Sequence, residues 1–219
     1  MAEINWGQIY CSTYWGDDSN KNSIPAEQFS QCPPASGRYV FLTKPQLQTG
    51  VDLWISDRAS ALSTYGQINT WNVTAITNMF NLFRDKTTFN DNISNWDVSN
   101  VTTFNSMFRG ATSFNQNISG WNTSSLNEMQ FMFFESTSFN QNLSSWNVSS
   151  VVSMRETFKD SGLSTINYSA KLIGWASRSV VSNVELGAGT IKYSASALSS
   201  RNTLTSAPNS WIITDGGQV

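Results

Sequence analysis

The side chains that could carry out chemistry are few in this chain, and they do not form a recognisable catalytic set. The 219 residues include no histidine, so the commonest general base and the commonest zinc ligand are both missing. Asp17 and Asp18 could offer oxygen ligands to a cation, but two adjacent acids in a loop are usually only solvated. We therefore expect no enzyme activity, no cofactor and no metal site.

One pair of carboxylates fits a hydrolytic reaction. Asp91 and Asp97 lie six residues apart, and glycoside hydrolysis needs two carboxyl groups on either side of the scissile bond. The corresponding residues in the next copy of the repeat described below are Gln116 and Asn122. Drift at a polar position explains the pair as well as a catalytic site does, so a polysaccharide-active enzyme is a minor alternative.

The sulfur atoms of the chain also have structural interpretations. Cys11 and Cys32 are the two cysteines; they form either a disulfide, which would suit an oxidising setting, or two reduced thiols. Four methionines could be read as a soft-metal site, but helical spacing beside phenylalanine is typical of a hydrophobic core. These methionines are Met79, Met129, Met132 and Met154.

The elements that position these side chains come from a 25-residue repeat between Trp71 and Phe158. One unit carries too little apolar surface to enclose a core alone, so stacked copies are expected to place equivalent residues in contact. This predicts a solenoid in which large aromatic residues form a structural ladder. The ladder residues are Trp71, Trp96, Trp121 and Trp146, then Phe83, Phe108, Phe133 and Phe158, and finally Phe89, Phe114 and Phe139.

Each copy divides into a helical half and an extended half. In the second copy Ser99 is the expected N-cap, and Val101, Phe104, Met107 and Phe108 follow at offsets that fit a short helix. The equivalent caps are Thr74, Ser124 and Ser149. The extended half carries asparagines that are expected to hydrogen-bond along the stack at its corners. These are Asn90, Asn115 and Asn140, with Asn92, Asn117 and Asn142.

The chain divides into four regions. Residues 1–42 are an irregular, aromatic-rich arm or cap, and residues 43–66 are a capping helix that starts with a Thr43 and Gln46 capping box. Residues 67–162 are the four-coil repeat solenoid. Residues 163–219 are a C-terminal cap, with helical stretches at 168–175 and 194–204 and a strand near 212.

The repeat units resemble those of the BspA-like family of surface proteins with 25-residue repeats. The resemblance is carried by residues 89–101 and 139–146, and by flanking segments at 51–57, 187–194 and 213–217. It covers roughly residues 43–217. It implies an α/β solenoid with leucine-rich-repeat-like coils of about 25 residues and N- and C-terminal caps, used for adhesion or binding at a surface. Such proteins occur in bacteria and are also encoded by phages, and they offer no catalytic motif to carry over.

These features favour a non-enzymatic binding or structural protein on a virion or extracellular surface. We expect a phage virion component, either a capsid decoration or a tail fibre, that contacts the host surface or neighbouring subunits. Residues 1–42 would dock other virion or surface proteins, and glycans or host surface proteins are further partners. A bacterial cell-surface adhesin module is the alternative. The start of the chain, Met1 to Trp6, does not read as a signal peptide.

Other classes of function have weaker support. The net charge of −2 provides no basic stripe for nucleic acid, and no apolar run approaches the roughly 18 residues that span a bilayer. Ice binding would need a flat row of hydroxyl groups, and Thr87, Thr112 and Thr137 form such a row in the sequence. Each of these threonines is closely followed by a ladder phenylalanine, which indicates a bend instead of a flat face.

Overall fold

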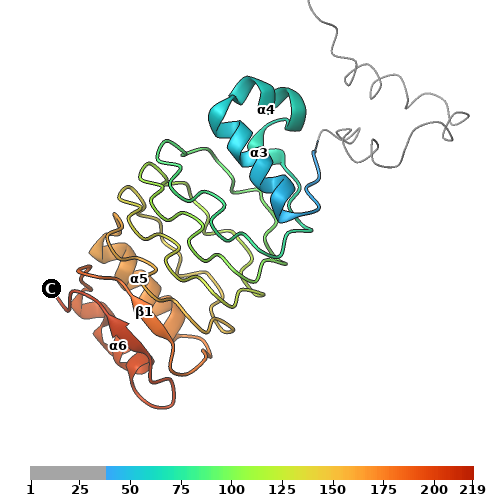
Figure 1. The fold of residues 1–219 in the computed structure, drawn as a ribbon. Helices are drawn as coiled ribbons and strands as arrows, with labels where there is room; N and C mark the ends of the chain where they lie inside the picture. Colours follow the sequence, from blue (N-terminus) through green and yellow to red (C-terminus); the bar gives the residue numbers. More distant parts are fainter. Residues whose placement is uncertain (1–37) are drawn as a thin grey trace, which may run out of the picture.

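The computed structural model of this protein describes residues 38–219 (Figure 1). Helices α3 (Lys44–Ser56) and α4 (Arg58–Tyr65) form one end of the molecule. Helices α5 (Thr165–Ala176) and α6 (Leu198–Thr205) lie at the other end, with the repeats between the two pairs. The candidate cysteines Cys11 and Cys32 and the acidic pair at 17–18 lie outside the described residues.

The start of α3 confirms the predicted capping box. The Thr43 side chain accepts a hydrogen bond from the backbone N–H of Gln46, and the Gln46 side chain accepts one from the backbone N–H of Thr43. This reciprocal pair satisfies two of the N–H groups that a helix start leaves without partners. Gly66 ends the helical region at a φ of 73°, as a glycine at a helix C-terminus commonly does.

The single helix predicted over 43–66 is wrong in its middle. The chain breaks at Asp57, which has φ −146° and ψ 88°, and α4 starts there as a separate helix. The Asp57 carboxylate accepts a hydrogen bond from the backbone N–H of Ser60 at 3.1 Å. An aspartate side chain competes in this way with the helical backbone, and it is favoured at an N-cap over a helix interior.

The predicted α/β solenoid of leucine-rich-repeat-like coils is also wrong. The described chain has four α-helices, all outside the repeats, and two short parallel strands in one sheet. After the 3₁₀ turn η3 (Ile68–Thr70), residues 71–164 contain turns and isolated β-bridges but no α-helix and no strand. The helical half and the extended half expected in each copy are therefore replaced by a succession of turns.

Backbone geometry explains why no helix forms inside a copy. Each copy places two residues, four positions apart, in the left-handed region of backbone space, which a right-handed helix excludes. The pairs are Asn81 and Asp85, Ser106 and Gly110, Phe131 and Glu135, and Glu156 and Asp160, with φ between 53° and 67°. Consecutive tight turns therefore bring the apolar residues to the core at spacings that would also suit a helix.

The residues expected to cap these helices have a different role. The backbone N–H of Ser99 donates a hydrogen bond to the side chain of Asp97 at 3.0 Å, and that of Thr74 donates to Asn72 at 3.0 Å. Ser124 and Ser149 make the same bond to Asn122 and Asn147. Such bonds form Asx turns, in which an Asp or Asn side chain mimics the backbone of a turn.

Equivalent aromatic residues of neighbouring copies contact one another in the core. The rings of Phe83 and Phe108 are nearly parallel with centroids 5.3 Å apart, and the next steps to Phe133 and Phe158 measure 5.7 and 5.8 Å. Every ladder residue named above is buried. The tryptophan row is less regular: Trp71 stacks on Trp96 and Trp121 on Trp146, each at 6.2 Å.

Hydrogen bonds also join neighbouring copies. The indole N–H of Trp96 donates to the backbone oxygen of Ile68 at 2.7 Å, and that of Trp146 donates to Ile118 at 3.0 Å. The backbone N–H of Asn115 donates to the Asn90 side chain at 2.9 Å. The prediction that this asparagine row bonds from copy to copy is confirmed, whereas Asn92, Asn117 and Asn142 form local turns.

The C-terminal region closes the other end of the core. Strand β1 (Glu185–Gly187) pairs in parallel with β2 (Ile212–Thr214), and a bridge between Met154 and Leu186 joins β1 to the fourth copy. The 3₁₀ turn η4 (Ala195–Ala197) precedes α6. The predicted helices at 168–175 and 194–204 and the strand near 212 are confirmed, with small shifts at their ends.

Candidate functional site

The carboxylate pair proposed for hydrolysis is divided between two structural roles. The indole N–H of Trp54 donates to one oxygen of Asp91 at 2.9 Å, and Arg58 donates to the other at 2.9 Å. Burial acts to raise the pKa of Asp91, but the hydrogen bonds from Arg58 and Trp54 outweigh it and leave the pKa lowered. Asp91 thus fastens α3 and α4 to the first copy.

Asp97 is held in a local turn by Ser99, which lies two residues later in the chain. The hydroxyl and the backbone N–H of Ser99 lower the pKa of Asp97. A general acid in glycoside hydrolysis needs a raised pKa, and both carboxylates have lowered values. Within residues 38–219, no group of three acidic, cysteine or histidine side chains is placed to hold a metal ion.

The threonine row considered for ice binding makes hydrogen bonds between neighbouring copies. The hydroxyl of Thr112 donates to the backbone oxygen of Thr87 at 3.3 Å, and that of Thr137 donates to Thr112 at 3.5 Å. Thr87 and Thr137 are exposed, so the row faces solvent, but the hydroxyls of Thr112 and Thr137 are engaged in bonds between neighbouring copies.

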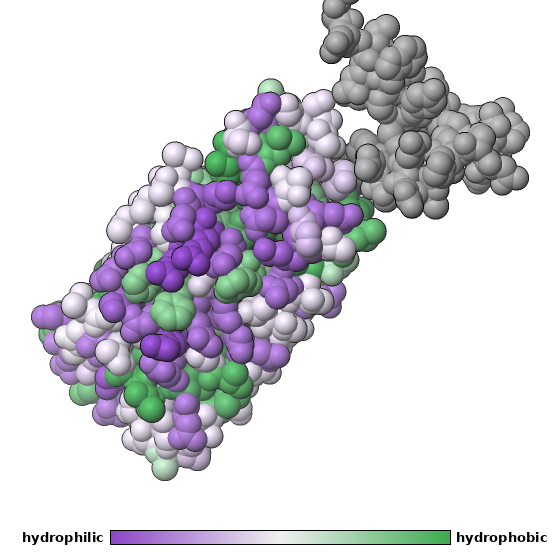
Figure 2. All heavy atoms as spheres, viewed as in Figure 1, coloured by the Kyte–Doolittle hydropathy of each residue, from purple (hydrophilic) through white to green (hydrophobic). Residues whose placement is uncertain are grey.

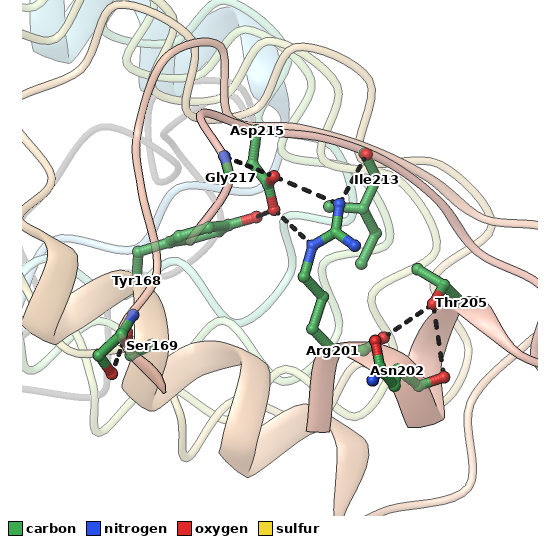
Figure 3. A network of polar contacts seen from close by, with 9 residues as sticks. Tyr168, Ser169, Arg201, Asn202, Thr205, Ile213, Asp215 and Gly217 are labelled. Carbon is green, nitrogen blue, oxygen red and sulfur yellow. Dashed lines mark hydrogen bonds and ion pairs between the residues drawn. The ribbon is translucent and has the colours of Figure 1, made fainter. Parts of the chain in front are cut away.

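A cluster of polar side chains lies between α5, α6 and the end of β2 (Figure 3). The Asp215 side chain is only 2% exposed and pairs with Arg201, whose Nε lies 2.8 Å from one of its oxygens. The Tyr168 hydroxyl donates to the same oxygen at 3.0 Å. Burial, and then the Asp215 charge, raise the pKa of Tyr168 well above its usual value.

This polar cluster is a structural tie. The second Asp215 oxygen accepts from Arg201 at 3.2 Å and from the backbone N–H of Gly217 at 3.2 Å, so the carboxylate is fully engaged. Arg201 also donates to the backbone oxygen of Ile213 at 3.3 Å. A buried carboxylate whose hydrogen-bonding positions are all filled holds the surrounding elements together.

The best candidate for a binding surface lies on the second, third and fourth copies. Phe131 and Phe134 are half-buried, with ring centroids 6.0 Å apart in an edge-to-face arrangement. Three cationic side chains surround them. Arg109 lies 5.0 Å from the Phe134 centroid, Lys159 lies 5.7 Å from it, and Arg155 lies 5.7 Å from the Phe131 centroid. We call these five residues the aromatic face.

The charges of the aromatic face are only partly balanced. Lys159 pairs with Glu156 at 2.9 Å, and hydrogen bonding and charge from Glu156 raise the pKa of Lys159. Within residues 38–219, Arg109 and Arg155 form no ion pair. Their guanidinium groups instead lie beside the aromatic rings, where each cation–π contact contributes roughly 0.5–1 kcal/mol at an exposed site.

The backbone of Phe131 takes the left-handed conformation that Ser106 and Glu156 also adopt at this position of their copies. Phe131 has a φ of 55°, in the left-handed region, which costs a residue with a side chain roughly 1–2 kcal/mol. The equivalent residue of the first copy is Asn81, and asparagine tolerates this conformation well. A strained aromatic residue that remains partly exposed is typical of a functional position.

The aromatic face was not singled out from the sequence, although the sequence contains a signal for it. The ladder positions keep tryptophan or phenylalanine from copy to copy, whereas the positions of the aromatic face change. Arg84, Arg109, Phe134 and Lys159 occupy one such position in successive copies. On the side of the molecule seen in Figure 2, apolar patches lie among hydrophilic residues over the repeats.

Comparison with protein families gives one match. A family model described as "Mycoplasma protein of unknown function, DUF285" matches residues 55–171. This is more than half of the chain. The chain belongs to the DUF285 family. The DUF285 match begins at the end of α3, includes the aromatic face and ends in α5.

The DUF285 description assigns no activity to the family. No curated protein and no solved structure matches the chain. The resemblance to the BspA-like family, and the phage origin that it allows, therefore stay predictions. None of the helices between residues 38 and 219 is long and apolar enough to span a bilayer.

Proposed function

We propose that this chain is a non-enzymatic binding module displayed on a surface, and that the aromatic face contacts its partner. The observation that carries the proposal is the pair of partly exposed phenylalanines, Phe131 and Phe134, surrounded by Arg109, Arg155 and Lys159. Aromatic and arginine side chains are enriched at protein–protein interfaces and dominate their hot spots.

The repeats supply the rigidity that such a surface needs. The core below the aromatic face is a continuous set of stacked rings. The ring centroid of Phe133 lies 3.7 Å from that of Phe139 and 5.8 Å from that of Phe158. A surface fixed by a packed core loses little conformational entropy when a partner binds. The partners we propose are host surface proteins, with glycans as the second class.

A bacterial cell surface and a phage virion are the two proposed locations of this module, and different observations support each. The family description names Mycoplasma, a bacterium, and this supports an adhesin module of a bacterial cell surface. A phage virion component, such as a capsid decoration or a tail fibre, rests on the sequence prediction. In either setting we propose an extracellular location and no catalytic role.

A binding experiment with two matched variants tests the proposal. The full chain is applied to an array of purified extracellular proteins and to an array of glycans, alongside Phe131→Ser/Phe134→Ser and the control Ile166→Ser. Ile166 is 79% exposed on α5, outside the aromatic face. We expect the double variant to lose about tenfold or more in affinity for any bound protein, which corresponds to about 1.4 kcal/mol, and the control to bind normally. Equal binding by all three proteins would refute the assignment of the aromatic face.

A further inference from the structure

We propose that the aromatic face binds a segment of its own chain, residues 1–37. The proposal uses the surface assigned above but needs no external partner. Residues 1–37 have the charge and the aromatic content that complement the aromatic face.

The composition of residues 1–37 complements the aromatic face. The segment contains four acidic residues and a single lysine, which gives it a charge of −3, whereas the whole chain carries −2. Residues 38–219 therefore carry +1. The acidic residues are Glu3, Asp17, Asp18 and Glu27. Carboxylates of this segment can pair with Arg109 and Arg155, which form no ion pair within residues 38–219.

The same segment carries the apolar groups that two half-buried phenylalanines would contact. Five aromatic residues occur within it: Trp6, Tyr10, Tyr14, Trp15 and Phe29. Aromatic pairs contribute roughly 0.5–1.5 kcal/mol beyond the apolar area that they bury. A segment that combines aromatic and acidic side chains can thus contact the rings of Phe131 and Phe134 and the adjacent guanidinium groups at once.

The aromatic face lies within reach of a chain that starts from the first described residues. Phe41, close to the first described residue, bonds to Asn72 at the start of the first copy. Copies are separated by steps of 5.3 to 5.8 Å along the phenylalanine ladder. A chain of 37 residues spans up to about 120 Å when extended, so the segment can reach the third and fourth copies of its own molecule.

The intramolecular contact is favoured over the same contact between two molecules. A tethered segment has an effective concentration in the millimolar range. A contact with a Kd below the millimolar range would therefore be largely formed within one chain, at concentrations where two chains rarely associate. This contact competes with the docking of residues 1–42 onto neighbouring subunits that the sequence predicts.

The two cysteines make the proposal testable in the full chain. Cys11 and Cys32 are the chain's only cysteines, and both lie in the segment. After reduction, nitroxide spin labels on these thiols report the mobility of the segment by electron paramagnetic resonance. We expect an immobilised component in the unaltered chain, and we expect its fraction to stay constant on dilution.

Variants of the aromatic face decide the outcome. Phe131→Ser/Phe134→Ser should shift the docking equilibrium about tenfold toward the mobile component. Arg109→Gln/Arg155→Gln should cause a similar shift, and this variant leaves all aromatic residues of the core in place. Ile166→Ser should have no effect. Labels as mobile in the unaltered chain as in both double variants would overturn the proposal, and so would an immobilised fraction that falls on dilution. Because no external partner is present, these outcomes are independent of the array experiment.

Discussion

Lys171 places an amine inside the protein without an acidic partner in residues 38–219. It is fully buried, its Nζ donates to the backbone oxygen of Gln141 at 2.7 Å, and it lies 5.3 Å from the ring centroid of Phe158. Burial lowers the pKa of Lys171 to about 7. The folded protein therefore favours the neutral amine only above about pH 7.

The lowered pKa of Lys171 predicts that stability rises with pH. Above about pH 7 the folded protein releases this proton, whereas the unfolded chain keeps it up to the ordinary lysine pKa of about 10.4, so the unfolded state binds more protons. Unfolding by urea should show a gain approaching about 1.4 kcal/mol per pH unit between about pH 7.5 and 9, and none below pH 6. The Lys171→Met variant should lack this dependence; an identical pH profile in both proteins would contradict the assignment.

Phe108 tests the contribution of the aromatic core at a single residue. Its ring lies 3.9 Å from that of Phe114 and 5.3 Å from that of Phe83, and it is fully buried. The Phe108→Ala variant should lose about 3–5 kcal/mol of unfolding free energy because a cavity forms. Phe80, which is 46% exposed, provides the control, and its change to alanine should cost less than about 1 kcal/mol.

Phe131 should show a trade-off between stability and binding. Changing it to asparagine, the residue at the equivalent position 81, relieves the unfavourable left-handed backbone conformation. We expect the unfolding free energy to rise by about 1 kcal/mol, while affinity for the partner falls. Calorimetric unfolding measures the first effect and the array experiment the second. A less stable variant would mean that the contacts of the ring outweigh the strain.

At the scale of elements, Asp91 connects the N-terminal helix pair to the repeats. Arg58 stacks 4.6 Å from the Trp54 ring centroid, and both residues bond to Asp91. Asp91→Ala would leave the indole N–H of Trp54 without its acceptor, at a cost of about 1–3 kcal/mol. Hydrogen exchange should accelerate in α3 and α4 and stay unchanged in α5, whereas uniform acceleration would argue against a local tie.

The same scale shows what the sequence could and could not predict. The capping box at Thr43 and the helices after residue 163 follow from local signals that tertiary contacts do not override. The break at Asp57 was missed because Asp57 and Ser60 fit a helix interior as well as a helix start. Inside the repeats, Gly110 is a residue type that favours a left-handed backbone, but Phe131 and Glu156 are not. The apolar spacing therefore predicts short helices that do not form.

At the scale of the whole molecule, the period of 25 residues identifies which side chains contact across copies but not what the surface does. Contacts such as Phe83 with Phe108 follow from the repetition of one residue type at one position. The aromatic face arises where that repetition fails, and its cation–π contacts join residues from three successive copies, such as Arg109, Phe134 and Lys159. The sequence shows where the residue type changes, as at position 134, but the cation–π contacts between copies are seen only in the structure.

The bond between Arg201 and the Ile213 carbonyl has a consequence for assembly. Ile212 and Ala188 carry the hydrogen bonds that join β2 to β1, and the carbonyl between the paired residues of β2 is occupied by the guanidinium group. An outer strand with free backbone groups is a template on which strands of other molecules can add. With this carbonyl occupied, β2 offers one backbone acceptor fewer to a strand of another molecule, which lowers its tendency to seed fibre growth.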